Sequence, residues 1–222
     1  TTTITPTGAI TLSGVVPADS VALSTGNVTG FVDKNVGVNK PVVYTGFTLS
    51  GTDAGNYSLP VNPNSTAIII PADLQVTGVT ASNKVYNANT TAVLGGTAAV
   101  APISGDVVSV ALTGTGVFAD KNVGTGKAVT VTGFTLTGND ASNYNVLQPT
   151  GVTANITQAD LQVSGVTALS KVYDTKTDAN LTGTAAVTAL GSDSVSVAGT
   201  GSGTFADKNV GMGKAVTVTG YT

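Results

Sequence analysis

The chain has 222 residues, with 12 acidic and 9 basic side chains and a formal net charge of −3. Every acid is Asp and every base is Lys, because Glu, Arg, His, Cys and Trp are absent. An acidic chain without Arg is not expected to bind nucleic acid. The absence of His and Cys excludes imidazole bases, thiolate nucleophiles, disulfides and the common zinc sites, so we expect neither an enzyme nor a cofactor.

The sequence predicts an all-β fold. Thr, Val and Gly supply nearly half of the chain, and strong helix formers are rare, which favours strands and turns. In the middle of the chain, alternating stretches and turn residues predict strands, in chain order, at residues 74–80, 84–86, 97–100, 107–113, 116–118, 127–136, 144–147 and 152–156. The one helix-like stretch, residues 138–144, is long enough for a single turn.

Apolar and charged segments give no sign of membrane insertion or of a leader. The longest apolar tracts, such as residues 67–70, are far short of the ~18 residues that a spanning helix needs. Residues 1–10 lack the charged and apolar regions of a secretion signal. We therefore expect no membrane insertion by this segment, and a targeting signal that lies outside it.

One motif recurs at a fixed spacing along the chain. It reads FVDKNVG at residues 31–37 and FADKNVG at residues 118–124 and 205–211, which is a period of 87 residues. Residues 71–135 and 158–222 are identical at 44 of 65 positions. Identity at this level in a fixed register indicates a tandem array of repeats.

The period divides the chain into three segments. Residues 1–70 are the C-terminal part of a repeat unit, residues 71–157 a complete unit, and residues 158–222 the N-terminal part of a third. A sheet with unpaired edges is avoided in folded domains, so we expect a longer parent chain to complete the partial units. The alternative is that another molecule supplies the missing strands.

The repeat length limits the architecture. Seven or eight short strands in 87 residues predict tandem β-sandwich, immunoglobulin-like repeats, whose usual size is ~100 residues. Two alternatives remain open: β-grasp-like units, which need an amphipathic helix, and a β-solenoid, whose rungs span roughly 20–30 residues. Short junctions between units predict stiff coupling and an array that forms a rod.

The D-K-N motif is interpreted as a tight turn. Asp or Asn would cap backbone N–H groups, with Phe118 and Val123 as core anchors on either side. The competing interpretation is an intramolecular amide crosslink among Asp120, Lys121 and Asn122, which is disfavoured because adjacent strand residues face opposite ways. The motif residues expected to have structural roles are Phe31, Asp33, Lys34, Asn35, Gly37, Phe118, Asp120, Lys121, Asn122, Gly124, Phe205, Asp207, Lys208, Asn209 and Gly211.

A second motif, G-x-D-A-x-N-Y, ends at Tyr57 and at Tyr144. Its carboxylates, Asp53 and Asp140, are candidate calcium ligands, although calcium loops usually carry more acids. A capped turn that leads into a buried Tyr144 is the favoured interpretation, so no metal site is expected.

A third motif, K-V-Y, occurs at residues 84–86 and 171–173. Its alternation predicts that Val85 and Val172 point into the core and that Tyr86 and Tyr173 pack at the rim.

Three stretches together resemble a known family. They are ADLQVSGVTALSKVYD (residues 159–174), FADKNVGTGKAVTVTGFTLTGNDASNY (residues 118–144) and GVTANIT (residues 151–157), and they resemble the YDG repeat, named for Tyr-Asp-Gly after a Lys-Val pair. The resemblance covers essentially every unit, but Ala88 and Thr175 replace the Gly of the name. YDG repeats occur in tandem in large secreted adhesins of Gram-negative bacteria, including filamentous-haemagglutinin-like proteins exported by two-partner secretion. The resemblance therefore implies an extracellular or cell-surface fibre, and it supplies no catalytic or ligand residues.

These observations lead to one functional expectation with an alternative. We expect a structural repeat module of a secreted adhesin or fibre, which acts as stalk, matrix or sheath and whose partners are neighbouring repeats. The alternative is a multivalent, low-affinity module that binds surface glycans or other copies of itself, in the latter case by strand exchange. Catalysis would have to rest on paired carboxylates such as Asp106 and Asp120.

Overall fold

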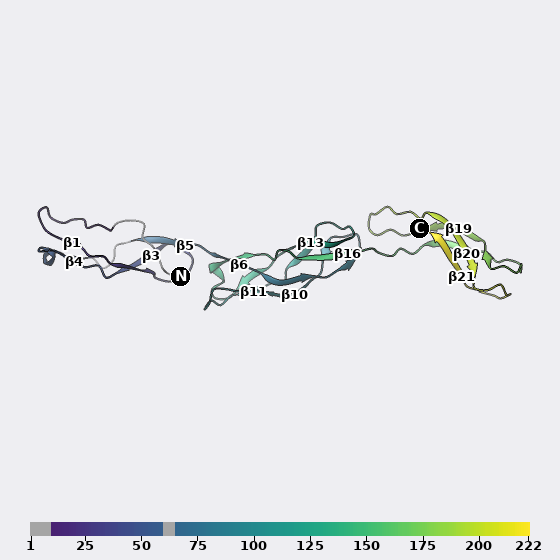
Figure 1. Ribbon diagram of the computed structural model, residues 1–222, viewed down its shortest axis with the longest axis horizontal. Helices are drawn as coiled ribbons and strands as arrows, with labels where there is room; N and C mark the ends of the chain where they lie inside the picture. The colour runs from purple at the N-terminus through teal and green to yellow at the C-terminus, as the bar shows by residue number, and fades with distance from the viewer. Residues whose placement is uncertain (1–9, 60–64) are drawn as a thin grey trace. The chain divides into compact units, whose positions relative to one another are not determined.

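The computed structural model describes residues 10–59 and 65–222 of the protein. The regular elements of this part are strands and two short 3-10 helices, with no α-helix (Figure 1). The all-β prediction is therefore confirmed. The chain forms two compact units: the first comprises Thr1–Gly78, Thr97–Thr113 and Gly133–Pro149, and the second comprises Val79–Gly96, Gly114–Thr132 and Thr150–Thr222.

The first compact unit contains small sheets with two or three strands. Its antiparallel elements are the pair β1 (Ala22–Leu23) and β4 (Leu49–Ser50), the sheet β2 (Asn27–Phe31), β3 (Gly37–Thr45) and β5 (Thr66–Ile69), and the pair β11 (Ser109–Ala111) and β14 (Thr135–Thr137). β6 (Ala72–Gln75) pairs in parallel with β15 (Tyr144–Leu147). The 3-10 helices η1 (Ala54–Asn56) and η2 (Ala141–Asn143) each follow a strand, β4 and β14.

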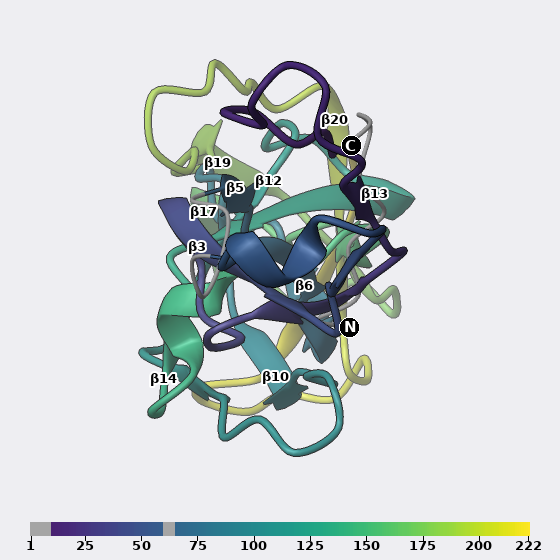
Figure 2. The same cartoon turned by 90° about the vertical axis from the view of Figure 1, so that its left-hand side faces the viewer.

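The second compact unit contains the largest sheet of the described chain. Its five strands have the order β8 (Lys84–Val85), β16 (Thr153–Thr157), β13 (Gly124–Thr132), β12 (Thr115–Phe118) and β9 (Thr91–Ala92). β13 lies between β16 and β12, and its broad arrow is visible in Figure 2. The rest of this unit consists of the pair β17 (Ser164–Ala168) and β19 (Leu181–Ala186) and the sheet β18 (Asp178–Ala179), β20 (Gly199–Phe205) and β21 (Val216–Tyr221).

Elements recur at the spacing of the sequence repeat. β7 (Thr77–Ala81) pairs with β10 (Leu94–Ala99), just as β17 pairs with β19, and each element of the second pair begins 87 residues after its counterpart. η2 likewise begins 87 residues after η1 and matches the single turn expected at residues 138–144. The repeat is therefore structural as well as sequential.

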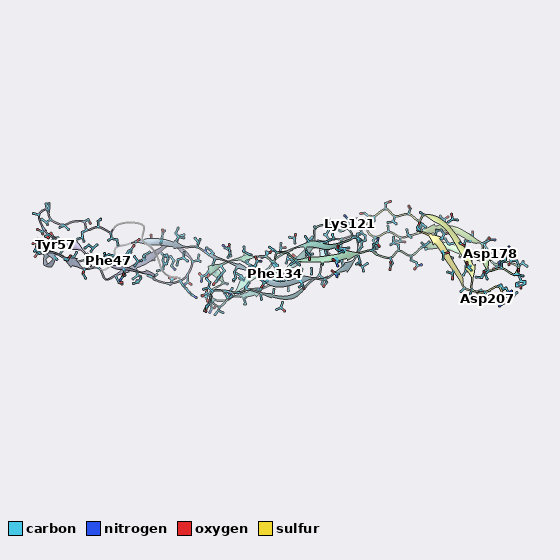
Figure 3. All side chains as sticks on the ribbon, in the orientation of Figure 1. Phe47, Tyr57, Lys121, Phe134, Asp178 and Asp207 are labelled. Atoms are coloured by element: carbon cyan, nitrogen blue, oxygen red, sulfur yellow. The ribbon has the colours of Figure 1, made fainter. Side chains whose placement is uncertain are left out.

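The buried core of each compact unit is small. In the second unit, Phe118 and Ile156 are 2% and 1% exposed, and Val129, Val131 and Ala154 of the five-stranded sheet are buried as well. Apolar alternation along β12, β13 and β16 points these side chains to one face. In the first unit, the buried side chains include Leu74, Val76, Phe134 and Tyr144, of which Phe134 is labelled in Figure 3.

The immunoglobulin-like arrangement of the strands is not confirmed. An immunoglobulin sandwich consists of two antiparallel sheets, whereas β6 pairs in parallel with β15 and β8 pairs in parallel with β16. These parallel pairs join β6 and β8, near the start of the middle repeat, to β15 and β16, near its end. The alternation of apolar and polar residues within one strand does not reveal such a pairing. Within the described residues, no helix is long and apolar enough to cross a bilayer.

Three predicted core positions are wrong. Val123, expected as an anchor beside the D-K-N turn, is 49% exposed, because the turn directs it outward. Val85 and Val172, expected to point inward from the K-V-Y motif, are 57% and 88% exposed. In β8, Lys84 is the residue that turns inward, so the alternation of this short strand is opposite in phase to the prediction.

Candidate functional site

Each D-K-N motif forms a turn closed by its own aspartate. Asp33, Asp120 and Asp207 accept a hydrogen bond from the backbone N–H two residues later, at 2.8, 2.7 and 2.7 Å. The same carboxylates bind the Lys that follows the motif: Lys40, Lys127 and Lys214. These contacts lower the pKa of the three carboxyl groups, first through the Lys and then through the backbone N–H. Because Asp holds the turn, the middle Lys of the motif is free to contact another segment.

The G-x-D-A-x-N-Y motif forms a second, recurring cluster. The Oδ2 atom of Asp140 accepts the backbone N–H of Val107 at 2.9 Å, and the Tyr144 hydroxyl donates to Oδ2 of Asp106 at 2.7 Å. Gly138, with φ of 118°, allows the motif to approach the preceding segment, since a Cβ there would lie 2.2 Å from the carbonyl oxygen of Val107. We call Asp106, Asp140 and Tyr144 the cradle. In both carboxylates these hydrogen bonds use Oδ2 and leave Oδ1 available for a further contact.

The Lys of the first D-K-N turn occupies the cradle of the next repeat. Lys34 forms ion pairs with Asp106 and with Asp140, the latter at 2.8 Å. The two carboxylate side chains are only 11% and 15% exposed, whereas that of Lys34 is 51% exposed. The side-chain amide of Asn143 completes the contact, because its Oδ1 accepts the N–H of Val36 at 2.9 Å. We call this set of contacts the clasp.

The electrostatics of the clasp favour an ion pair. The hydrogen bonds to Asp106 and Asp140 raise the pKa of Lys34. Lys34, followed by the Tyr144 hydroxyl, lowers the pKa of Asp106, and Lys34, followed by the Val107 N–H, lowers the pKa of Asp140. Amide formation between a Lys and a carboxyl group requires a neutral amine and a protonated acid, and these shifts disfavour both forms. The clasp is therefore an ionic contact.

A second clasp joins the middle and third repeats. Lys121, labelled in Figure 3, forms an ion pair with Asp193, which lies 87 residues after Asp106. Here the Tyr86 hydroxyl donates to Oδ2 of Asp193, the role that Tyr144 has in the first clasp. The contact with Asp193, followed by that with Tyr86, raises the pKa of Lys121, and Lys121 lowers the pKa of Asp193. The same Lys-to-Asp contact thus occurs twice, and the two partners are 72 positions apart each time.

The positions of the remaining motif residues follow from these clusters. Gly37 and Gly124 begin β3 and β13, Phe31 and Phe205 are half-buried, and Gly211 is exposed. Tyr173 is 53% exposed, and Lys208 and Asn209 are exposed as well.

The K-V-Y motif organises a loop through its Lys. The ammonium of Lys84 donates to Oδ1 of Asn87 at 2.8 Å and to the carbonyl oxygens of Asn89 and Thr91 at 2.7 and 3.1 Å, and it lies 5.3 Å from the centre of the Phe118 ring. Burial lowers the pKa of this Lys. The motif therefore has a structural role, and its Lys binds the loop that precedes β9.

The loop after K-V-Y has a backbone conformation that suits Gly, the residue that the YDG repeat carries there. Ala88 and Thr175, which replace that Gly, have φ values of 62° and 68°. L-residues other than Gly are strained in this left-handed region, and a β-branched residue is the most strained. At these two positions the backbone therefore has a conformation that suits Gly better than Ala or Thr.

Replacing Thr175 by Gly is expected to stabilise the protein. Relief of the strained φ outweighs the extra flexibility of Gly in the unfolded chain, for a net gain of about 1 kcal/mol or less in the free energy of unfolding. Urea denaturation followed by circular dichroism measures the change. Ala186→Gly, within β19, is the matched control and is expected to destabilise. A loss of stability in Thr175→Gly would contradict the strain argument.

The calcium candidates are engaged in other contacts. Asp53 accepts the backbone N–H of Ser20 at 2.8 Å, and Asp140 is part of the first clasp. Among the residues that the structure describes, no three His, Cys, Asp or Glu side chains come together at a position suited to a metal ion. Asp106 and Asp120, considered for paired-carboxylate chemistry, are bound to Lys34 and Lys127 respectively.

Sequence reasoning identified both motifs of the clasp but not their contact. Asp106, Asp193 and Asn143 were not recognised as partners of the D-K-N turn, because they are remote from it in the sequence. One available signal was the equal spacing from Lys34 to Asp106 and from Lys121 to Asp193. A second was that the Asp of each turn binds the following Lys, which leaves the middle Lys in need of an acidic partner.

Comparison with known proteins identifies the repeat. The sequence matches the YDG domain over residues 1–67, 70–153 and 157–222. No curated protein and no solved structure matches the chain. Because the three matched segments cover nearly the whole sequence, the chain belongs to the YDG domain family.

Proposed function

We propose that this chain is a non-catalytic, structural repeat module of a secreted, bacterial cell-surface adhesin or extracellular fibre. In this role, YDG repeats form a stalk, matrix or sheath, and the principal partner of each repeat is its neighbour. The observation that carries the proposal is the recurring clasp, since Lys34 and Lys121 each connect one repeat to an Asp of the next. A contact that recurs with the period of the repeats favours a structural role between neighbouring repeats, whereas an active site needs a single specialised pocket.

The two clasps give neighbouring repeats a defined register. An exposed ion pair alone contributes little to stability. In the first clasp, however, a two-carboxylate cradle, a Tyr hydroxyl and an Asn-to-backbone hydrogen bond act together at one junction. Repeat arrays derive much of their stability from such contacts between neighbours.

Surface labelling and domain replacement test the proposal. Antibodies raised against the chain are expected to label intact cells of the producing organism. Replacing residues 71–157 in the parent protein by an unrelated β-domain of similar length is expected to leave adhesion intact, because a spacer contributes length rather than recognition. Labelling only after the cells are permeabilised, or loss of adhesion with unchanged surface display, would contradict the structural role.

A further inference from the structure

Two parallel strand pairs connect the beginning of the middle repeat to its end. β6 runs beside β15 over four paired positions, from Ala72 opposite Tyr144 to Gln75 opposite Leu147. β8 runs beside β16 over two positions. Each pair lies within one compact unit, the first pair in the first unit and the second pair in the second. Every pair of partners is 72 positions apart, so each strand pair bridges most of the repeat.

The direction of the strands decides how a pull along the chain acts on the first pair. The middle repeat begins at residue 71 and ends at residue 157. Tension between these points pulls β6 from its N-terminal end and β15 from its C-terminal end. Because the strands are parallel, these two ends lie at opposite ends of the pair. The pull therefore slides one strand along the other, and all hydrogen bonds between the strands resist it together. A pull on neighbouring ends would break the same bonds one after another.

Side-chain hydrogen bonds reinforce the first pair. The Nε2 atom of Gln75 donates to the carbonyl oxygen of Gln148 at 2.7 Å, one residue beyond the end of β15. The Nδ2 atom of Asn145 donates to Oδ1 of Asp73 at 3.2 Å. Both bonds connect the two strands in addition to the backbone ladder, so they oppose sliding as well.

Buried apolar side chains shield the first pair from water. Leu74 and Tyr144 of the two strands are buried, and so is Val76, whose backbone N–H donates to the carbonyl oxygen of Leu147 at 2.9 Å. A hydrogen bond in such surroundings is stronger than one in water, and water is not at hand to replace a stretched bond. The pair is therefore short but well protected.

The second pair is loaded in the same direction. Tension that passes the first pair reaches β8 from its N-terminal side, and β16 is pulled from its C-terminal end. The N–H of Tyr86 donates to the carbonyl oxygen of Thr157 at 2.8 Å, and Oδ1 of Asn83 accepts the N–H of Asn155 at 2.7 Å. These bonds resist sliding after β6 and β15 have separated.

We propose that the pair of β6 and β15 is a mechanical clamp, which carries tension across the middle repeat and keeps residues 76–143 out of the path of the force. The pair of β8 and β16 is the second barrier. This inference builds on the proposed structural role, in which neighbouring repeats transmit a pull along the chain, and it assigns the contacts that bear the force. The structural role stands unchanged if the clamp proves weak.

Single-molecule pulling of the whole chain in two directions tests the proposal. The chain has no Cys, so two introduced Cys residues define the points of attachment. Thr150→Cys places one of them just after β15. The other is either Ile70→Cys, before β6, or Thr77→Cys, after it, and all three positions are exposed. Attachment through positions 70 and 150 shears the pair, whereas attachment through positions 77 and 150 peels it apart.

The two directions are expected to give different unfolding rates at the same constant force. The sheared protein is expected to unfold roughly tenfold more slowly than the peeled one, because several hydrogen bonds must break in one step. Each event is expected to lengthen the tether by roughly 250 Å, the extended length of the chain between β6 and β15. Equal rates in the two directions would overturn the proposal, since the same bonds break in both.

Gln75→Ala tests the contribution of the clamp itself. Without the bond to Gln148, the unfolding rate under shear is expected to rise roughly fivefold. Gln158→Ala makes the same substitution at an exposed position outside both pairs and is expected to keep the wild-type rate. Circular dichroism verifies that both variants fold. An unchanged rate in Gln75→Ala would also overturn the proposal. Surface labelling of cells tests the structural role separately, so failure of that role and failure of the clamp are distinguishable.

Discussion

Replacing Phe118 by Ala is expected to reduce the free energy of unfolding of the five-stranded sheet by about 3–5 kcal/mol. Phe118 ends β12, is 2% exposed, and belongs to the core that β13 and β16 complete with Val129 and Ile156. So small a core has few other large side chains to collapse into the resulting cavity. Hydrogen exchange resolved by segment measures the effect, with the largest loss of protection expected in β12, β13 and β16.

The third repeat supplies a matched control for this substitution. Phe205 occupies the equivalent position at the end of β20, but it is half-buried and lines a groove of about 510 Å³. Phe205→Ala is therefore expected to reduce the free energy of unfolding clearly less than Phe118→Ala does, because less buried apolar surface is lost and water already reaches the site. Equal losses in the two variants would show that β16 does not contribute to the burial of Phe118.

The elements that the sequence predicted best are those set by local physics. Asp followed by Lys and Asn predicted a tight turn, because a short carboxylate binds the backbone N–H two residues later. Period-two alternation located β16, turn residues delimited the short strands β12 and β15, and the absence of helix formers predicted the all-β class. These features depend on neighbours within a few residues, which the sequence displays directly.

The features that sequence reasoning missed depend on contacts between distant segments. The parallel pair β6 and β15 joins residues 72 positions apart, and local alternation does not show whether a strand pairs in parallel. The wrong inward placement of Val85 arose from a strand of two residues, too short to define its own phase. The clasp was missed for the same reason, since Lys34 and Asp106 are adjacent only once both repeats have folded.

Lowering the pH is expected to open the first clasp. The pKa values of Asp106 and Asp140 are lower in the folded chain than the ordinary value of 3.8. The stability that the two ionised carboxylates give to the clasp is therefore fully present above that value. It is lost as the pH falls below that value and through their lowered pKa in the folded chain. The Val36 amide, which donates to Asn143 at 2.9 Å, is the reporter of the junction. Its protection from hydrogen exchange, relative to the intrinsic rate at each pH, is expected to be constant from pH 7 to 5 and to decrease several-fold below pH 4.

The variant Lys34→Gln separates the clasp from general acid unfolding. Without the ammonium, both carboxyl groups lose the principal cause of their low pKa. Protection of the Val36 amide from hydrogen exchange is therefore expected to be several-fold weaker at neutral pH, and to change little between pH 7 and 4. Lys176→Gln has the same change in charge and is expected to keep the wild-type profile. Amides of β13 report the sheet, which this clasp does not touch, and their protection is expected to be equal in all three proteins. If Val36 in Lys34→Gln retains the wild-type protection and pH profile, the ion pairs do not hold the junction, and the Asn143 contact alone couples the two repeats.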